Sequence, residues 1–213
     1  MQHLLLTADN LGDMASQAAE IVRGGGVVLY PTETLYGLGA DALSDAAVQK
    51  LYEIKGRPEG KPIHALVADI EMAARFGAID ERAQRLVAHI HKPISIIVQK
   101  HAEYTSGILK NLDTFGFRIA THPFCRALVR AFGGPITTTS ANRAGRLPYR
   151  GVPAILEQLG PAASGIGLIV DAGELPEREP STIVDLSGSH PEILREGTVS
   201  AEEIQELLKR EGV

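Results

Sequence analysis

The chain lacks several residue types that would point to particular classes of protein. Tryptophan is absent from its 213 residues, aromatic residues make up 5%, and cysteine occurs once, as Cys125. A single cysteine excludes an intramolecular disulfide and a zinc site built on cysteines. We predict that Cys125 is a small buried hydrophobe near a helix start, not a nucleophile. No apolar run approaches the roughly 18 residues that a membrane span needs, and no export signal is evident. We therefore expect a cytoplasmic protein without a membrane partner.

The charge balance is mildly acidic, with a formal net charge of −5. This argues against nonspecific nucleic-acid binding by the whole surface, although basic runs at residues 50–61 and 126–150 could line a local cleft. An RNA-binding module that uses a concave basic face without catalysis is therefore one hypothesis. The low aromatic content disfavours it, because single-stranded nucleic acids are commonly bound by stacking on aromatic side chains.

The segment 26–62 carries the strongest local signal of a binding site. Residues 27–30, VVLY, form a short apolar run between glycines and a proline, which predicts a buried strand. Thr32, Glu33 and Thr34 follow it, at the strand end where open α/β sheets bind ligands. We expect Gly37 and Gly39 to let the backbone approach the ligand closely.

A predicted helix over residues 44–54, with Ser44 as N-cap, follows this turn. It delivers Lys55, Arg57 and Lys61 in one short segment. A guanidinium beside ammonium groups suits a phosphate-bearing ligand. The segment 56–62 is not a P-loop, since it is one residue too short and Pro62 stands where a magnesium-binding Ser or Thr belongs.

The rest of the chain alternates between helical and strand patterns. We predict further helices at 13–23, 80–91, 123–132, 152–159 and 200–210, a helical turn at 70–74, and a loop at 143–151. Ser200 and Glu203 match a capping box. Further strands are predicted at 63–67, 95–99, 116–120, 136–139, 168–171, 182–185 and 192–195. Because some strands are linked by helices and others by turns, the fold class is α/β with a mixed sheet, in one domain over residues 1–213.

Six motifs, in order along nearly the whole chain, carry a family resemblance: YPTETLYGLG, KGRPEGKP, FRIATHP, TTSAN, STIVD and REG. Together they resemble the YrdC/TsaC family of threonylcarbamoyl-AMP synthases. The resemblance implies a twisted open α/β sheet with flanking helices and a large concave ligand-binding face. It also implies a nucleotidyltransferase that converts L-threonine, bicarbonate or CO2, and ATP into threonylcarbamoyl-AMP and pyrophosphate. Mg²⁺ would enter with ATP, and we expect no metal site on the protein. The product would pass to tRNA-modification partner proteins that make N6-threonylcarbamoyladenosine. A carbamoyl-transferring domain of the same superfamily is a further alternative, although such domains usually lie in much longer chains.

The resemblance also implies roles for individual residues. Lys55 and Arg57 would be catalytic. The L-threonine site would comprise Thr34, Arg118, Thr138 and Ser181, and the ATP site Arg57, Lys61, Thr114, Ser140, Asn142 and Arg195. The family often has a histidine at the position of Leu66, whereas this chain has His64 two residues earlier. The roles of His64 and Glu33 are therefore left open.

Overall fold

The structure is a computed structural model that describes residues 1–58 and 62–209. In these residues ten strands form a sheet in the order β1-β8-β2-β3-β7-β4-β6-β5-β9-β10. The strands are β1 (Gln2–Leu5), β2 (Val27–Pro31), β3 (Tyr36–Gly39), β4 (His64–Val67), β5 (Ile94–Gln99), β6 (Thr114–Ile119), β7 (Ile136–Ser140), β8 (Ile166–Asp171), β9 (Thr182–Asp185) and β10 (Glu192–Arg195). The helices are α1 (Leu11–Arg23), α2 (Asp45–Lys55), α3 (Ile70–Ala74), α4 (Glu81–His89), α5 (Pro123–Phe132), α6 (Val152–Leu159) and α7 (Ala201–Lys209), with 3-10 turns η1 (Gly107–Leu109) and η2 (Gly160–Gly165).

The sheet is mixed, as predicted. β1–β8, β2–β8, β4–β6 and β5–β9 pair in parallel, whereas β2–β3, β3–β7, β4–β7, β5–β6 and β9–β10 pair antiparallel. β7 joins the two halves of the sheet: Ser140 lies opposite Gly37 of β3, and Thr138 lies opposite His64 of β4. The polar end of β7 therefore lies in the middle of the molecule.

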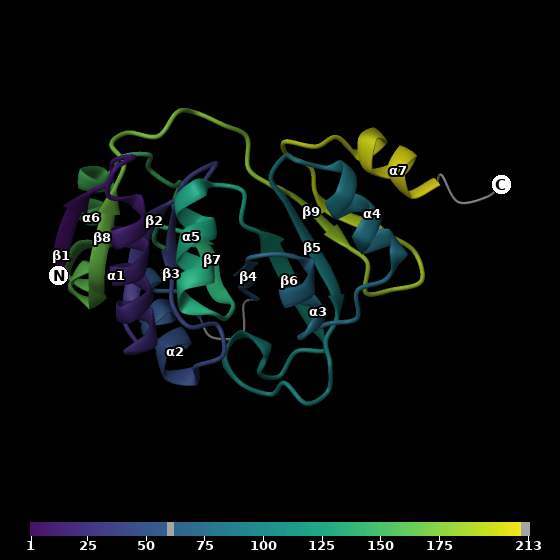
Figure 1. Cartoon of the computed structure of the whole chain (residues 1–213), viewed down its shortest axis with the longest axis horizontal. Helices are drawn as coiled ribbons and strands as arrows, with labels where there is room; N and C mark the ends of the chain where they lie inside the picture. The colour runs from purple at the N-terminus through teal and green to yellow at the C-terminus, as the bar shows by residue number, and fades with distance from the viewer. Residues whose placement is uncertain (59–61, 210–213) are drawn as a thin grey trace.

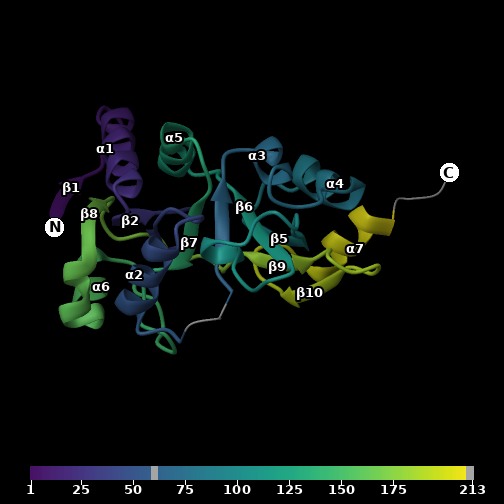
Figure 2. The ribbon, with the colours of Figure 1, turned by 90° about the horizontal axis from the view of Figure 1, so that it is seen from below.

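Helices cover both faces of the sheet. Figure 2 shows α1 and α5 on one side and α2 and α6 on the other. α1 and α5 pack on inward residues of β2 and β8 such as Val28 and Leu168, while α2 and α6 pack on Val27 and Leu29. The segment 172–181 runs from β8 across to β9 (Figure 1). Among the described residues, no helix combines the length and apolar character needed to cross a membrane.

Local capping signals account for the helix ends that the sequence predicted well. The Ser44 hydroxyl accepts a hydrogen bond from the Ala47 N–H at 3.3 Å at the start of α2. α5 spans the predicted residues, with Pro123 in its first turn and Gly133 at φ 81° after its end. At α7 the Ser200 hydroxyl caps the Glu203 N–H at 3.2 Å, but the Glu203 carboxylate pairs with Lys92 instead of closing the capping box. Cys125 is fully buried in α5, as expected.

The prediction for Gly37 and Gly39 needs correction. These residues belong to β3, a strand that we did not predict, and not to an open glycine turn. A Cβ at Gly39 would lie 2.7 Å from Cε1 of Tyr30 and 2.9 Å from Cγ2 of Ile136. Gly39 therefore makes room for the buried Tyr30 ring, and only Gly37 also reaches the cavity described next.

Candidate functional site

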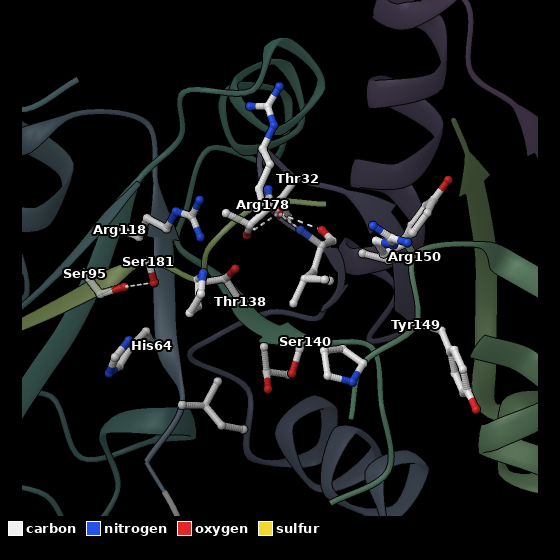
Figure 3. Close-up of a pocket in the computed structure, with 18 of the residues that line it drawn as sticks. Thr32, His64, Ser95, Arg118, Thr138, Ser140, Tyr149, Arg150, Arg178 and Ser181 are labelled. Atoms are coloured by element: carbon white, nitrogen blue, oxygen red, sulfur yellow. Dashed lines mark hydrogen bonds between the residues drawn. The ribbon is translucent and has the colours of Figure 1, made fainter. Parts of the chain in front are cut away.

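A cavity of about 1030 Å³ opens where the polar ends of several strands meet. Its walls are rich in hydroxyl groups and guanidinium groups. The hydroxyl-bearing residues are Thr32, Thr34, Tyr36, Ser95, Thr138, Thr139, Ser140, Tyr149 and Ser181, and the guanidinium groups are those of Arg57, Arg118, Arg150, Arg178 and Arg195. In the view of Figure 3, His64, Ser95, Ser181 and Arg118 lie on one side and Tyr149 and Arg150 on the other, with Thr138 and Ser140 between them. The cavity is thus cationic, rich in hydroxyl groups and large enough for a nucleotide.

The structure brings most of the predicted site residues together in this cavity. They are Thr34, Arg57, Arg118, Thr138, Ser140, Ser181 and Arg195. Lys55, Thr114 and Asn142 are not among the residues that line it, and Lys61 lies outside the described residues. Thr114 begins β6, four residues before Arg118, which places it roughly 13 Å along the strand.

The turn after β2 is shaped by Thr32. Its hydroxyl donates to the Leu35 carbonyl at 2.7 Å and accepts from the N–H groups of Thr34 and Leu35, each at 3.2 Å. The Thr34 hydroxyl lies 3.4 Å from that of Thr32. Because Thr32 closes the turn, the Thr34 hydroxyl is not needed for backbone capping and can serve a ligand.

Arg118, on β6, is fixed by Glu33. Its Nη2 donates to Glu33 Oε2 at 2.6 Å, and both side chains are about nine-tenths buried. Burial alone would raise the pKa of Glu33, but Arg118 and hydrogen bonds from Thr121 and His122 outweigh it and hold that pKa below its usual value. The cavity therefore contains an arginine backed by an ionised carboxylate.

Arg195, on β10, is fixed by Ser181, the residue that precedes β9. Its Nε and Nη2 donate to the Ser181 carbonyl at 3.0 and 2.8 Å, and Nη2 also donates to the Ser181 hydroxyl at 3.0 Å. That hydroxyl lies 3.4 Å from the hydroxyl of Ser95 on β5. Burial, and then repulsion from Arg118, lower the pKa of Arg195. Ser181 thus contacts β5 through Ser95 and β10 through Arg195 at one wall of the cavity.

The placement of Lys55 differs from the expected contact with phosphates. Its side chain is 2% exposed, and its ammonium donates to the carbonyl oxygens of Ser140 and Asn142 and, at 3.5 Å, to Asn142 Oδ1. The Asn142 amide in turn donates to the carbonyls of Arg143 and Arg146 at 3.0 and 2.6 Å. Burial, then the charge of Arg57, lower the pKa of Lys55 to about 7. Lys55 and Asn142 therefore hold the loop that follows β7, behind the cavity wall.

His64 enters the site from β4. Its ring packs over Gly116, where a Cβ would collide with it, which explains the glycine of the FGFR segment. Burial, followed by the charges of Arg195, Arg57 and Arg118, lowers the pKa of His64 to about 4. The cavity therefore has a neutral imidazole among cations. Arg57 lines the same cavity and its Nη2 donates to the Pro62 carbonyl at 3.0 Å, while burial lowers its pKa.

Several cavity residues were not predicted from the sequence. Ser95 lies on β5 within an apolar run, and Tyr149, Arg150 and Arg178 lie in loops. Arg150 pairs with Glu177 of the segment 172–181 at 3.3 Å. The one available signal was the position of Ser95 between apolar residues, where a buried hydroxyl needs a partner.

The described residues contain no group of three or more His, Cys, Asp or Glu side chains that could hold a metal ion. The side chains around the cavity are mainly hydroxyls and cations, which do not suit a resident divalent cation. A magnesium ion that enters with a triphosphate needs few protein ligands.

Comparisons with known proteins agree with this architecture. The Sua5/YciO/YrdC family model, described as "Telomere recombination", matches residues 20–197. A threonylcarbamoyl-AMP synthase of Bacillus subtilis is 33% identical over 196 residues, covering 91% of this chain and 56% of that protein. One of Aliivibrio fischeri is 30% identical over 175 residues, covering 80% and 92%.

Two solved structures share the fold. Sua5 of P. abyssi, complexed with L-threonine, superimposes with a TM-score of 0.87 at 30% identity, covering 98% of this chain and 60% of that one. YciO of E. coli gives a TM-score of 0.80 at 25% identity, covering 95% and 97%. The chain spans little more than half the length of the B. subtilis relative and of P. abyssi Sua5. From the match to 178 contiguous residues and from these relatives, the chain belongs to the Sua5/YciO/YrdC family.

Proposed function

We propose that this chain is an L-threonylcarbamoyladenylate synthase, a nucleotidyltransferase that acts in the cytoplasm on L-threonine, bicarbonate or CO2, and ATP. The observation that carries the proposal is the cavity, which gathers Arg57, Arg118 and Arg195 with threonine and serine hydroxyls from four separate strands and turns. The relatives named threonylcarbamoyl-AMP synthase and the threonine-bound Sua5 structure support the same substrates.

The amino acid would bind at the end of the cavity near Arg118. A guanidinium can hold a carboxylate through two parallel hydrogen bonds, and Arg118 is the arginine whose orientation is fixed by a buried carboxylate. Thr34, Thr138 and Ser181 would supply hydrogen bonds to the amino and hydroxyl groups of L-threonine.

The nucleotide would bind toward Ser140, with its phosphates near Arg57 and Arg195. Lys61, outside the described residues, remains a proposed phosphate ligand. Lys55 and Asn142 would act through the loop after β7, which they hold by hydrogen bonds to its backbone. Thr114 lies away from the cavity wall, so its expected contact with ATP has no support in this arrangement. Mg²⁺ would enter bound to the ATP phosphates.

The chemistry would proceed in two steps. The neutral amine of L-threonine attacks the carbon of CO2, and loss of a proton from nitrogen gives the carbamate. A carbamate oxygen then attacks the α-phosphorus of ATP, and the bond to the β-phosphate oxygen breaks to release pyrophosphate. The described cavity residues offer guanidinium groups for the charge that builds up on the phosphates, so catalysis would rest on positioning and electrostatic stabilisation.

The product would be transferred to partner proteins that modify tRNA, and direct contact with RNA would be secondary. The alternative, an RNA-binding module without catalysis, would use the same cationic surface. No specific feature of the cavity favours this alternative. Two acidic residues, Glu174 and Glu177, also line the cavity. The aromatic residues among its described walls are Tyr149 and Tyr36, which gives few rings for bases to stack on.

The deciding experiment measures pyrophosphate release from ATP by the purified chain, with L-threonine and bicarbonate each present or omitted, and identifies the nucleotide product by mass spectrometry. We expect release that requires both, with threonylcarbamoyl-AMP as product. If ATP remains intact in every mixture while RNA binds with steep salt dependence, the binding-module hypothesis replaces the synthase.

A further inference from the structure

Glu33 is the most completely bonded carboxylate around the cavity, yet it is not itself among the cavity-lining residues. Its Oε2 accepts from Arg118 Nη2 at 2.6 Å. Its Oε1 accepts from the N–H groups of Thr121 and His122 at 2.9 and 2.6 Å and from the Thr121 hydroxyl. Four donors from two elements therefore fix this carboxylate behind the wall.

These contacts leave Arg118 with a defined orientation and with unused donors. A guanidinium has five N–H donors, and one of them goes to Glu33. Nε of Arg118 is buried without a hydrogen-bond partner among the described residues, so it does not help to hold the side chain. The remaining N–H groups, on Nη1 and Nη2, are the donors that Arg118 can present to a ligand in the cavity.

We infer that Glu33 is a positioning residue, which sets the Arg118 guanidinium for the carboxylate of the amino-acid substrate while leaving nucleotide binding unaffected. The inference rests on the proposed function, because it assigns the Arg118 end of the cavity to the amino acid. In this assignment Glu33 makes no contact with the substrate. Its negative charge, considered alone, would repel an anionic ligand in the cavity.

That sign gives the inference a sharp test. If Glu33 acted merely through its charge, removing it would make the cavity more positive and would strengthen binding of a carboxylate. If Glu33 positions Arg118, removing the charge frees the guanidinium and weakens carboxylate binding. Glu33→Gln keeps the size of the side chain but places an amide N–H₂ against either Arg118 or the Thr121 and His122 donors.

The experiment is calorimetric titration of the whole chain with L-threonine, with L-threoninol, in which a hydroxymethyl group replaces the carboxylate, and with ATP. We expect Glu33→Gln to weaken L-threonine binding about 10- to 100-fold, the range for a lost hydrogen bond to a charged group. Binding of L-threoninol and of ATP should change less than about threefold. In turnover, the KM for L-threonine should rise and the KM for ATP should stay near the wild-type value.

Two further variants separate positioning from a structural role. Thr121→Val removes one donor to Glu33 but keeps the ion pair, so its effect on L-threonine binding should be several-fold smaller than that of Glu33→Gln. In an Arg118→Met background, Glu33→Gln should cause no further loss of L-threonine affinity, because a residue that acts through Arg118 has nothing left to position. If Glu33→Gln does not fold, Glu33→Asp carries the same test, since it keeps the charge but shortens the reach.

The inference is overturned if Glu33→Gln binds L-threonine as tightly as the wild type or more tightly. It is also overturned if the variant loses as much affinity for L-threoninol and ATP as for L-threonine, or if the losses of L-threonine affinity from Glu33→Gln and Arg118→Met are additive. Failure of the proposed function has a different signature, which is a wild-type chain that does not bind L-threonine at all.

Discussion

Replacing Lys55 with methionine would distinguish a residue that holds the site together from one that touches the phosphates. Methionine keeps an unbranched apolar chain of similar length and removes the ammonium. In the structure that ammonium donates to two backbone carbonyls and one side-chain oxygen in residues 140–142 and is almost completely buried. The variant therefore leaves buried acceptors without their donor.

The expected loss of stability follows from two opposing contributions. A hydrogen bond from a charged donor contributes about 1.5–3 kcal/mol, and buried acceptors left unpaired cost about 1–3 kcal/mol each. Removing the ammonium also removes the several kcal/mol that its burial costs. We expect a net decrease of about 2–4 kcal/mol in the free energy of unfolding, which corresponds to a fall in Tm of roughly 5–15 °C for a chain of this size.

The assay is equilibrium unfolding in urea, with the KM for ATP measured on the same samples. Lys50→Met is the matched control, because Lys50 lies on the same helix and its exposed ammonium donates to the Gly25 carbonyl at 2.8 Å. We expect this control to change the unfolding free energy by less than about 1 kcal/mol. If Lys55→Met is as stable as the wild type but inactive, Lys55 contacts substrate directly, and the holding role assigned to it here is wrong.

Three further changes test other parts of the site. Arg57→Ala should lower adenylate formation by about 100-fold or more while the unfolding free energy stays within about 1 kcal/mol, since the hydrogen bond from Arg57 to the Pro62 carbonyl is exposed; near-normal turnover would remove Arg57 from the site. His64 should make stability rise with pH from about 4 to 6.5, because the unfolded chain binds the proton more tightly in that window. His64→Gln should remove up to about 3 kcal/mol of this rise, measured by urea unfolding at several pH values, and an unchanged profile would show that His64 is not buried and neutral. Gly39→Ala should cost about 1–3 kcal/mol through overpacking against Tyr30, seen as a lower Tm, and an unchanged Tm would contradict that packing.

The sequence predicted those elements whose signals are local. Pro123 and Gly133 bracket α5, and the capping hydroxyls of Ser44 and Ser200 begin α2 and α7. β1 and β3 were not predicted. β1 has four mostly exposed residues at a sheet edge, and β3 contains two glycines, a residue that is depleted in strands, so neither carries the usual pattern.

The sequence identified many of the residues of the candidate site but not how they are arranged in space. Contiguous motifs identified Arg118 and Ser181, but the pairing of β5 with β9 that brings Ser95 to Ser181 depends on contacts far apart in the sequence. The same limit applies to Lys55. A lysine at the end of a helix next to a cationic segment suggests a phosphate ligand, and only the packing of α2 against the loop after β7 shows that its ammonium faces backbone carbonyls.

The electrostatics of the cavity bear on how such a site could accelerate the proposed formation of the adenylate. Burial lowers the pKa values of Arg57 and Arg195, and Arg195 is further destabilised by Arg118, so the free protein holds these cations at a cost. The free energy of folding offsets this unfavourable electrostatic energy. Each arginine comes from a different element and is held by neighbouring carbonyls or by Glu33. The anionic substrates of the proposed reaction would relieve the repulsion when they bind. In the proposed reaction, charge that builds on the leaving pyrophosphate would relieve it further, so guanidinium groups held in place beforehand would favour the transition state over the bound substrates.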